Sequence, residues 1–180
     1  FESVDLITKF KEGQHLVLTG GSPLKQQDML EEFIKSFKNK YGFLPYLEIE
    51  NECTIEPSEY LMKFIDQWNN SPKLSNSGMK ENVRYKKHIL QQLGVEGEEF
   101  RGLNSWFKFV VDCEEDWQEI NEFFLEPGLI LKEQIIIMPQ GMTQEELKIS
   151  RPIAADMAIK HGVRFSDRLH VTIWNKKTGV

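Results

Sequence analysis

The chain has 180 residues, of which 40% are hydrophobic, and it carries a formal net charge of -6 at pH 7. This length and composition suffice for a single domain, residues 1–180, with a core of its own. An acidic chain without a block of lysine and arginine is a poor partner for nucleic acid or for an anionic membrane. No apolar stretch approaches the roughly 20 residues of a membrane span, and no signal peptide is recognisable, so the sequence predicts a cytoplasmic protein.

Strands alternate with helices in the first half of the chain. The pattern predicts a helix over residues 3–10 with Leu6, Ile7 and Phe10 on its buried side. A strand over residues 16–19 precedes a helix whose apolar residues follow the spacing i, i+3, i+4, i+7. The stripe of that helix consists of Leu30, Phe33, Ile34 and Phe37, and the next predicted elements are a strand over residues 46–50, a short helix over 58–63 and a strand over 64–68.

The same alternation continues in the second half. A helix is predicted over residues 81–93 from the stripe Val83, Leu90 and Leu93, and a strand over residues 107–111. Loops are expected over residues 69–79 and 94–104. The remaining predictions are a helix marked by Trp117, Ile120 and Phe124, a buried strand over residues 134–138, a helix with a Thr143–Glu146 capping box that Pro152 kinks or restarts, and a last strand in which Leu169, Val171 and Ile173 alternate.

The order of these elements predicts a mainly parallel sheet, because a βα unit is repeated five times before a closing strand. A crossover helix in such a sheet needs a strand before it as well as after it. The helix over residues 3–10 has no strand before it in this chain. We therefore expect that the first βα unit is missing.

The turn after the first strand is a candidate ligand site. The apolar run that begins at Leu16 stops at Gly20 and Gly21, and Ser22 and Pro23 follow directly. Paired glycines accept backbone torsions that side chains resist, and a helix that begins near Pro23 presents free N–H groups to a carboxylate or a phosphate. The alternative is a tight strand-to-helix turn in which Ser22 is only the N-cap.

Polar or turn-forming residues follow four of the predicted strands. In a parallel sheet ligands bind outside the carboxyl ends of the strands, so these residues are expected to converge on one edge. Taken singly, Lys73 can be a solvated lysine, Glu50 a strand-end cap and residues 139–141 a turn. The four segments are 19–22 (TGGS), 50–52 (ENE), 71–73 (SPK) and 138–141 (MPQG).

Three ordered motifs of the chain resemble those of the 7-carboxy-7-deazaguanine synthase family, whose members are radical S-adenosylmethionine enzymes. Residues 18–24 (LTGGSPL) resemble the family's T-G-G-E-P-L, and residues 50–57 resemble its E-T-N-G-T segment. SPKL at 71–74 with NSG at 76–78 resembles S-P-K-L-x-N-S-G. The likeness extends through residues 108–111, residues 138–141, and RLHV at 168–171 with Trp174, although strand-edge packing and ion pairing remain the alternative for Arg168 and His170.

The resemblance implies an α/β fold, an incomplete (β/α) barrel, and an enzyme, a radical S-adenosylmethionine lyase of 7-deazapurine (queuosine-type) biosynthesis. The activity is expected of the complete protein, and this chain alone is expected to be inactive. The implied reaction is a radical ring contraction of 6-carboxy-5,6,7,8-tetrahydropterin to 7-carboxy-7-deazaguanine. Its cofactors would be S-adenosylmethionine, a 4Fe-4S cluster held by three cysteines, and Mg²⁺. A small-molecule pterin is then the partner, and a homodimer is the expected assembly.

The resemblance also implies roles for residues of this chain. Gly21 would offer its backbone to the methionyl end of S-adenosylmethionine, and Thr19 would hydrogen-bond the pterin. Glu50 would position polar groups near the cofactor. The residues expected to line the cofactor side are Ser71, Pro72, Lys73 and Gln140.

The chain departs from the family pattern in three places. Nothing before Thr19 resembles the family's C-x3-C-x2-C loop or the magnesium-binding hydroxyl next to it. Cys53 and Cys113 lie 60 positions apart, too few for a disulfide scaffold and wrongly spaced for a zinc pair, so they are predicted to be reduced thiols that do not replace three cluster ligands. Ser22 stands where the family has glutamate, and residues 51–53 replace its Thr-Asn-Gly. The alternative function is therefore a non-catalytic pterin- or nucleoside-binding module, or a subunit that obtains its cluster from a partner.

Overall fold

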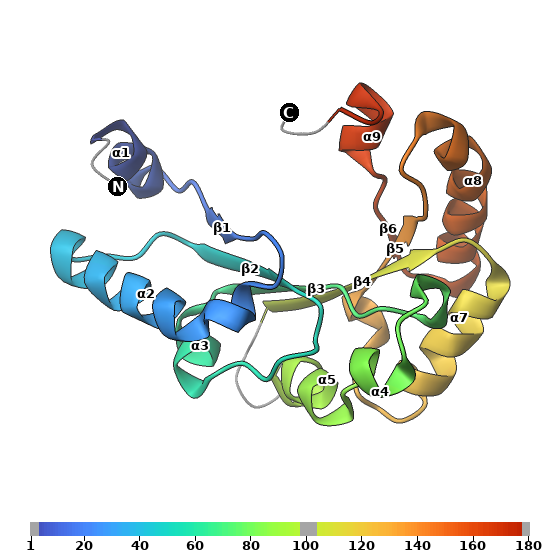
Figure 1. Ribbon diagram of the computed structural model, residues 1–180, viewed down its shortest axis with the longest axis horizontal. Helices are drawn as coiled ribbons and strands as arrows, with labels where there is room; N and C mark the ends of the chain where they lie inside the picture. Colours follow the sequence, from blue (N-terminus) through green and yellow to red (C-terminus); the bar gives the residue numbers. More distant parts are fainter. Residues whose placement is uncertain (1–3, 98–103, 178–180) are drawn as a thin grey trace.

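Six parallel strands form one open sheet in chain order. The computed structural model describes residues 4–97 and 104–177, and in it each strand pairs with the next one along the chain. Figure 1 shows the sheet curving into an open trough, with helices on its convex side. This confirms the predicted α/β fold with a parallel sheet, as in an incomplete barrel. The strands are β1 (Leu16–Leu18), β2 (Leu47–Asn51), β3 (Gln67–Asn70), β4 (Asn104–Val111), β5 (Ile135–Pro139) and β6 (Arg164–Phe165).

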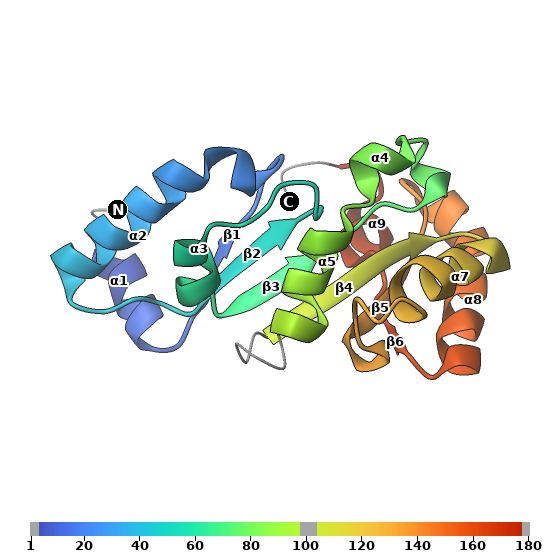
Figure 2. The same ribbon diagram turned by 90° about the horizontal axis from the view of Figure 1, so that it is seen from below.

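Helices cover the convex side and flank the mouth of the trough. Seen from below in Figure 2, α2, α3, α5, α4 and α7 lie across the convex face, and Figure 1 places α1 and α9 beside the mouth. Single turns of 3-10 helix span Pro23–Gln26, Ser75–Ser77 and Lys132–Gln134, and a π-helical segment spans Asn121–Leu125. The α-helices are α1 (Val4–Lys11), α2 (Gln27–Tyr41), α3 (Glu59–Phe64), α4 (Glu81–Arg84), α5 (Lys87–Leu93), α7 (Glu114–Ile120), α8 (Gln144–His161) and α9 (Leu169–Trp174).

The two faces of the sheet differ because strand side chains alternate. On β4, Phe107 and Phe109 are fully buried against the helices, and Lys108 between them faces the trough. On β2, Ile49 is buried and its neighbours Glu48 and Glu50 face the trough. Burying each large apolar side chain stabilises the fold by about 1.5–3 kcal/mol, so the convex side holds the core and leaves the trough free for polar side chains.

Most of the predicted elements are confirmed, with boundaries that shift by one to three residues. In α2 the predicted stripe is the buried one, since Ile34 and Phe37 are buried and Leu30 packs against the core. The third strand begins at Gln67 rather than at residue 64, because α3 continues to Phe64. The predicted loop over residues 94–104 lies partly outside the described residues.

The last predicted strand, over residues 169–173, is wrong: this segment is the helix α9, and the closing strand is β6. The Asp167 carboxylate accepts hydrogen bonds from the Arg168 backbone N–H at 2.8 Å and from the Thr172 hydroxyl at 3.0 Å. These contacts stabilise the first turn of a helix. The apolar alternation therefore does not reflect a strand, and of its three residues Val171 is buried whereas Leu169 and Ile173 are exposed.

The predicted helix over residues 81–93 is interrupted at Tyr85 and Lys86, which separate α4 from α5. The Tyr85 hydroxyl donates to the backbone carbonyl of Phe123 at 2.8 Å, and its ring packs edge-on against Phe123. This tertiary contact accompanies an extended backbone at Tyr85. Val83, predicted to be on the apolar stripe, is exposed.

The start of α8 is capped by half of the predicted box. Thr143 Oγ1 accepts from the Glu146 backbone N–H at 3.1 Å, but the Glu146 carboxylate accepts from the Met142 backbone N–H instead of from Thr143. The helix then runs unbroken through Pro152, so the predicted restart does not occur. Within residues 4–97 and 104–177, no helix combines the length and the apolar character that a membrane crossing requires.

Candidate functional site

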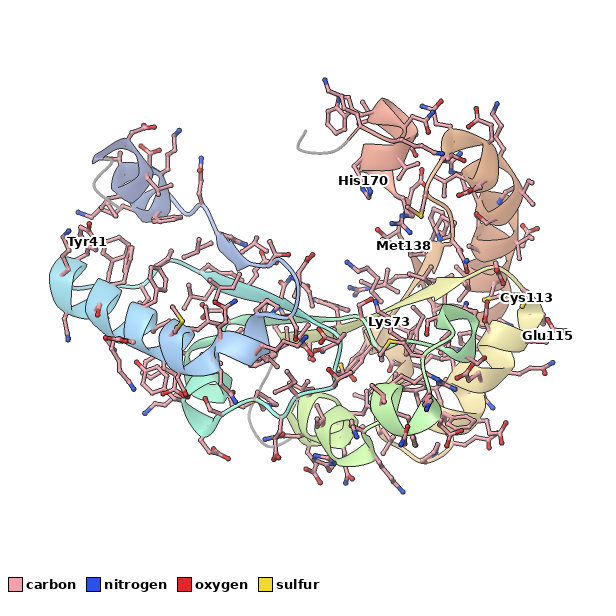
Figure 3. The ribbon with its side chains drawn as sticks, viewed as in Figure 1. Tyr41, Lys73, Cys113, Glu115, Met138 and His170 are labelled. Atoms are coloured by element: carbon pink, nitrogen blue, oxygen red, sulfur yellow. The ribbon has the colours of Figure 1, made fainter. Side chains whose placement is uncertain are left out.

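The carboxyl ends of β1 to β4 enclose a cleft of about 500 Å³, here called the main cleft. A second cleft of about 180 Å³ shares Ser71 and Lys73 with it and extends to Gln140. Figure 3 shows Lys73 low in the trough, with Met138 and His170 above it on the side of β5 and α9. The main cleft is lined by Thr19, Gly20, Gly21, Glu50, Asn51, Glu52, Asn69, Ser71, Lys73, Met79 and Lys108.

The structure brings the residues predicted as a site to these two clefts. Four segments that are far apart in the sequence meet there because the strands that precede them, β1, β2, β3 and β5, are parallel and belong to one sheet. Thr19, Gly21 and Glu50 line the main cleft, and Pro72 and Gln140 line the second one. Ser71 and Lys73 line both. Figure 3 places Cys113 and Glu115 at the outer end of the sheet near α7, away from Lys73.

The Gly20–Gly21 turn requires glycine for its backbone. The φ angles are +97° and +63°, in the region that L side chains rarely adopt, and a Cβ added to either residue would meet no atom within 4 Å among the described residues. The glycines therefore leave open space on the cleft side rather than filling a tight packing position. Both a simple turn and close approach of a ligand are compatible with this geometry.

Ser22 occupies the N-cap position of the turn that follows β1, but its side chain does not cap that turn. Among the described residues, the Ser22 side chain makes no capping hydrogen bond, and Pro23 opens a 3-10 turn instead of an α-helix. The α-helix α2 begins only at Gln27. The buried side chain of Leu24 anchors this turn in the core, so packing rather than capping fixes the exit of the chain from the cleft.

Glu50 on β2 contacts residues from β4 and from the end of β1 across the main cleft. The Thr19 hydroxyl donates to Glu50 Oε2 at 2.7 Å, and Lys108 Nζ lies 3.9 Å from Glu50 Oε1. Because Lys108 is on β4, this ion pair crosses above β3. About half of the Glu50 side chain remains exposed, so the carboxylate can also meet a ligand.

Glu48, two residues earlier on the same face, is occupied by protein contacts. His15 Nδ1 lies 2.6 Å from Glu48 Oε1, and Gln67 Nε2 and Asn69 Nδ2 donate to Glu48 Oε2 at 2.9 and 2.8 Å. Partial burial raises the pKa of the Glu48 carboxyl, but the hydrogen bonds from His15 and Asn69 outweigh it, so its pKa lies below the ordinary value. This residue has a structural role.

A buried row of amide and hydroxyl groups supports the main cleft from beneath. Asn51 Nδ2 donates to Asn70 Oδ1 at 2.6 Å, and Asn70 Nδ2 donates to Ser105 Oγ at 2.7 Å. The backbone carbonyl of Asn51 accepts from the Ser71 N–H at 2.7 Å. The row ties the carboxyl ends of β2 and β3 to the first residues of β4. Sequence reasoning missed it, because these polar residues carry no signal that they are buried.

Cys53 follows this row in an unusual backbone conformation. Its N–H donates to Asn51 Oδ1 at 2.7 Å, its φ is +60° and its side chain is fully buried. Glycine is the residue that adopts this conformation without strain, and it is the residue that stands here in the family pattern that this segment resembles. Burial raises the pKa of the Cys53 thiol, so the buried thiol is inert.

The segment that carries Lys73 is fixed by a buried ion pair. Arg84 on α4 pairs with Glu119 on α7, and both side chains are at most 10% exposed. Arg84 Nη1 also donates to the Lys73 carbonyl at 3.4 Å. Glu119 accepts from the Ser75 backbone N–H at 2.9 Å and from the Ser75 hydroxyl at 2.5 Å. The pair therefore holds residues 73–75 at the rim of both clefts.

Gln140 and the C-terminal motif lie on the other wall. The Gln140 N–H donates to the Val111 carbonyl at 2.9 Å, and its own carbonyl accepts from the Ser150 hydroxyl. His170 is exposed on α9, and Arg168 is half-buried just before it. Strand-edge packing of Arg168 and His170 is wrong, because neither residue is part of a strand.

The two cysteines of the chain do not fit a three-thiolate cluster. Cys53 is buried beneath the main cleft, whereas Cys113 is the N-cap residue of α7 and its pKa is raised to about 11, mainly by burial. Both are free thiols.

The side chains of Asp112, Cys113 and Asp116 form a separate group, in which the Cys113 sulfur and one oxygen of each carboxylate lie within 4.8 Å of one another. Asp116 Oδ2 accepts hydrogen bonds from the backbone N–H groups of Asp112 and Cys113. Asp116 Oδ1 accepts from Asn76, so this group caps a helix.

Comparison with known proteins finds three curated relatives, while no family model matches the chain. The chain is 30% identical over 166 residues to a 7-carboxy-7-deazaguanine synthase from Pyrobaculum aerophilum, covering 92% of this chain and 67% of that protein. Proteins of the same name from Halobacterium salinarum and Rhodopirellula baltica are 29% and 28% identical, over 94% and 92% of this chain and 68% and 63% of their own lengths. The chain therefore spans about two thirds of the length of these relatives.

Proposed function

Since the chain belongs to the 7-carboxy-7-deazaguanine synthase family, we propose that its two adjoining clefts bind S-adenosylmethionine and a carboxylated tetrahydropterin. The reaction would be the ring contraction of 6-carboxy-5,6,7,8-tetrahydropterin to 7-carboxy-7-deazaguanine, a lyase step of queuosine-type biosynthesis. S-adenosylmethionine would supply the radical chemistry for this step only when a reduced iron–sulfur cluster gives it one electron, and the described residues of this chain do not hold such a cluster. The observation that supports this function is the convergence of four polar segments on one edge of the sheet.

The charges of the main cleft suit a ligand that carries both signs. Lys73 and Lys108 provide cations, and Glu50 and Glu52 provide anions, within one space of about 500 Å³. The methionyl group of S-adenosylmethionine has an ammonium and a carboxylate that match such a lining. The open turn at Gly21 allows the backbone to approach this group closely.

The proposed roles divide the clefts into a cofactor side and a substrate side. Ser71, Pro72, Lys73 and Gln140 would line the cofactor side, where hydroxyl, ammonium and amide groups are available. Thr19 would hydrogen-bond the pterin from the opposite rim, next to Glu50. The two cysteines are assigned no cluster ligation and no residue is assigned to Mg²⁺. The proposed assembly of this protein is a homodimer.

Binding of the two ligands to the chain tests this function. S-adenosylmethionine and the stable analogue 6-carboxypterin are titrated separately by calorimetry, and the affected residues are identified by NMR. Both are expected to bind with Kd near the millimolar range, with shifts at Thr19, Gly21, Lys73 and Gln140. Binding of 6-carboxypterin without S-adenosylmethionine would favour the non-catalytic binding module, and binding of neither would refute the proposed function.

The Gly21→Val variant is expected to abolish binding of S-adenosylmethionine, because a β-branched residue resists φ +63° and its side chain would project into the main cleft. Gly128→Val is the matched control. Gly128 has φ +67° and equally open surroundings, but it does not line either cleft. Undiminished binding by folded Gly21→Val would mean that the Gly20–Gly21 turn is only a turn.

A further inference from the structure

The Thr19 hydroxyl faces the main cleft with its only proton already engaged. A hydroxyl has one donor and two acceptor lone pairs. Thr19 donates to Glu50 Oε2 at 2.7 Å, a short hydrogen bond to a carboxylate. What the Thr19 oxygen can still offer to a ligand is a lone pair. A ligand group at this position must therefore carry an N–H or O–H donor.

The orientation of Thr19 depends on where Glu50 is held. Glu50 is about half exposed, and a carboxylate on a flexible side chain that is half in solvent can adopt several rotamers. Glu48 differs, because three side chains hold it in place. Two of them, Gln67 and Asn69, are on β3, and His15 directly precedes β1. Among the residues that the structure describes, Lys108 is the cation paired with Glu50, at 3.9 Å from the oxygen that Thr19 does not use.

Lys108 is placed to fix this carboxylate from across the sheet. It lies on the trough face of β4, between two phenylalanines that are fully buried on the other face, so its backbone position is fixed by the core. Its side chain passes above β3 to reach Glu50 on β2. Less than a third of that side chain is exposed, which limits the positions that its ammonium can take.

We propose that Lys108 is a positioning residue: it holds Glu50 so that Glu50 Oε2 takes the Thr19 proton, and Thr19 then selects a ligand edge that donates a hydrogen bond. This inference rests on the proposed function only for the identity of the ligand. The ring N–H and amino groups of a pterin are donors of the required kind. A carbonyl or carboxylate oxygen at the same position would face the lone pairs of Thr19 and be repelled.

The first test needs no ligand. Three-bond NMR couplings to the Thr19 methyl carbon report whether its side chain holds one rotamer. The wild-type chain and Lys108→Arg are expected to hold one, and Lys108→Met is expected to show averaged couplings. Lys148→Met, which removes an exposed lysine on α8, is the control and should match wild type. A single unchanged Thr19 rotamer in Lys108→Met would overturn the proposal.

The second test is a double-mutant cycle on binding of 6-carboxypterin. Thr19→Val removes the acceptor and is expected to weaken binding by about tenfold, the effect of one hydrogen bond. Lys108→Met is expected to weaken binding in wild type and to have no further effect in Thr19→Val, because it acts through Thr19. An equal loss in both backgrounds would mean that Lys108 contacts the ligand itself and would overturn the positioning role. If wild type does not bind 6-carboxypterin, the proposed function fails, and the couplings still decide the role of Lys108.

Discussion

Glu48 and Glu50 lie two positions apart on the same face of β2, and both point into the trough. Glu48 accepts hydrogen bonds from Gln67 and Asn69 and pairs with His15. Glu50 has Thr19 and a more distant Lys108 as partners and stays half exposed. The two carboxylates have the same chemistry. Their neighbours in the fold give Glu48 a structural role and leave Glu50 accessible to a ligand.

The same difference separates the two ends of the trough. At the amino end, His15 stacks on Tyr46, and Asn104 Nδ2 donates to the Tyr46 hydroxyl and to Gln67 Oε1, so polar side chains satisfy one another. At the carboxyl end the polar side chains surround a cleft of about 500 Å³. Parallel sheets place ligands at this end because the loops there are free to vary while the strands hold them in register.

The largest expected effect tests whether the carboxyl end of the trough depends on the buried Arg84–Glu119 ion pair. Arg84→Met should lower the free energy of unfolding by about 3–5 kcal/mol, because it leaves the buried carboxylate of Glu119 without its cation. Urea denaturation measures it. Lys160→Met is the control, since its ion pair with Glu114 is exposed and should contribute little. Equal, small losses for both variants would mean that the Arg84–Glu119 pair does not hold the rim.

A smaller effect tests the two glutamates directly. Glu48→Ala should lower the free energy of unfolding by about 2 kcal/mol, because it leaves donors on Gln67 and Asn69 without their acceptor. Glu50→Ala should cost about 0.5 kcal/mol or less but should weaken binding of 6-carboxypterin. Denaturation and calorimetry on both variants measure the contrast. A larger loss of stability for Glu50→Ala than for Glu48→Ala would contradict the structural role of Glu48 and the accessibility of Glu50.

The smallest effect is the part of the pH dependence of stability that Glu48 contributes. Its pKa is lower in the folded protein than the ordinary value of 4.5, so its stabilisation is fully present above about pH 4.5 and is lost as the pH falls through the folded pKa. Each unit of lowering contributes about 1.4 kcal/mol. Urea denaturation between pH 7 and pH 3 should therefore show that wild type and Glu48→Gln converge in acid. A constant difference down to pH 3 would contradict this assignment.

Local patterns in the sequence were sufficient to predict helices and strands whose burial follows from the periodicity of the element itself. The stripe through Ile34 and Phe37 predicted α2, and the apolar run at residues 134–138 predicted β5. The polar segments after the strands predicted the edge at which the clefts lie. The alternation at residues 169–173 failed because Asp167 and Thr172 stabilise a helical turn that apolar spacing does not encode.

The sequence by itself determined the parallel α/β fold, the edge that carries the clefts and the family, because apolar periodicity, strand-end residues and ordered motifs are local properties of the chain. Only the tertiary structure decided that protein side chains occupy Glu48 whereas Glu50 stays half exposed, and that Cys53 has a positive φ. It also decided that Arg84, in a buried pair with Glu119, holds the Lys73 carbonyl. The partners in these contacts come from different strands and helices. Arg84 and Glu119, for example, are 35 positions apart, and no spacing rule links residues that meet only when the sheet and its helices have packed.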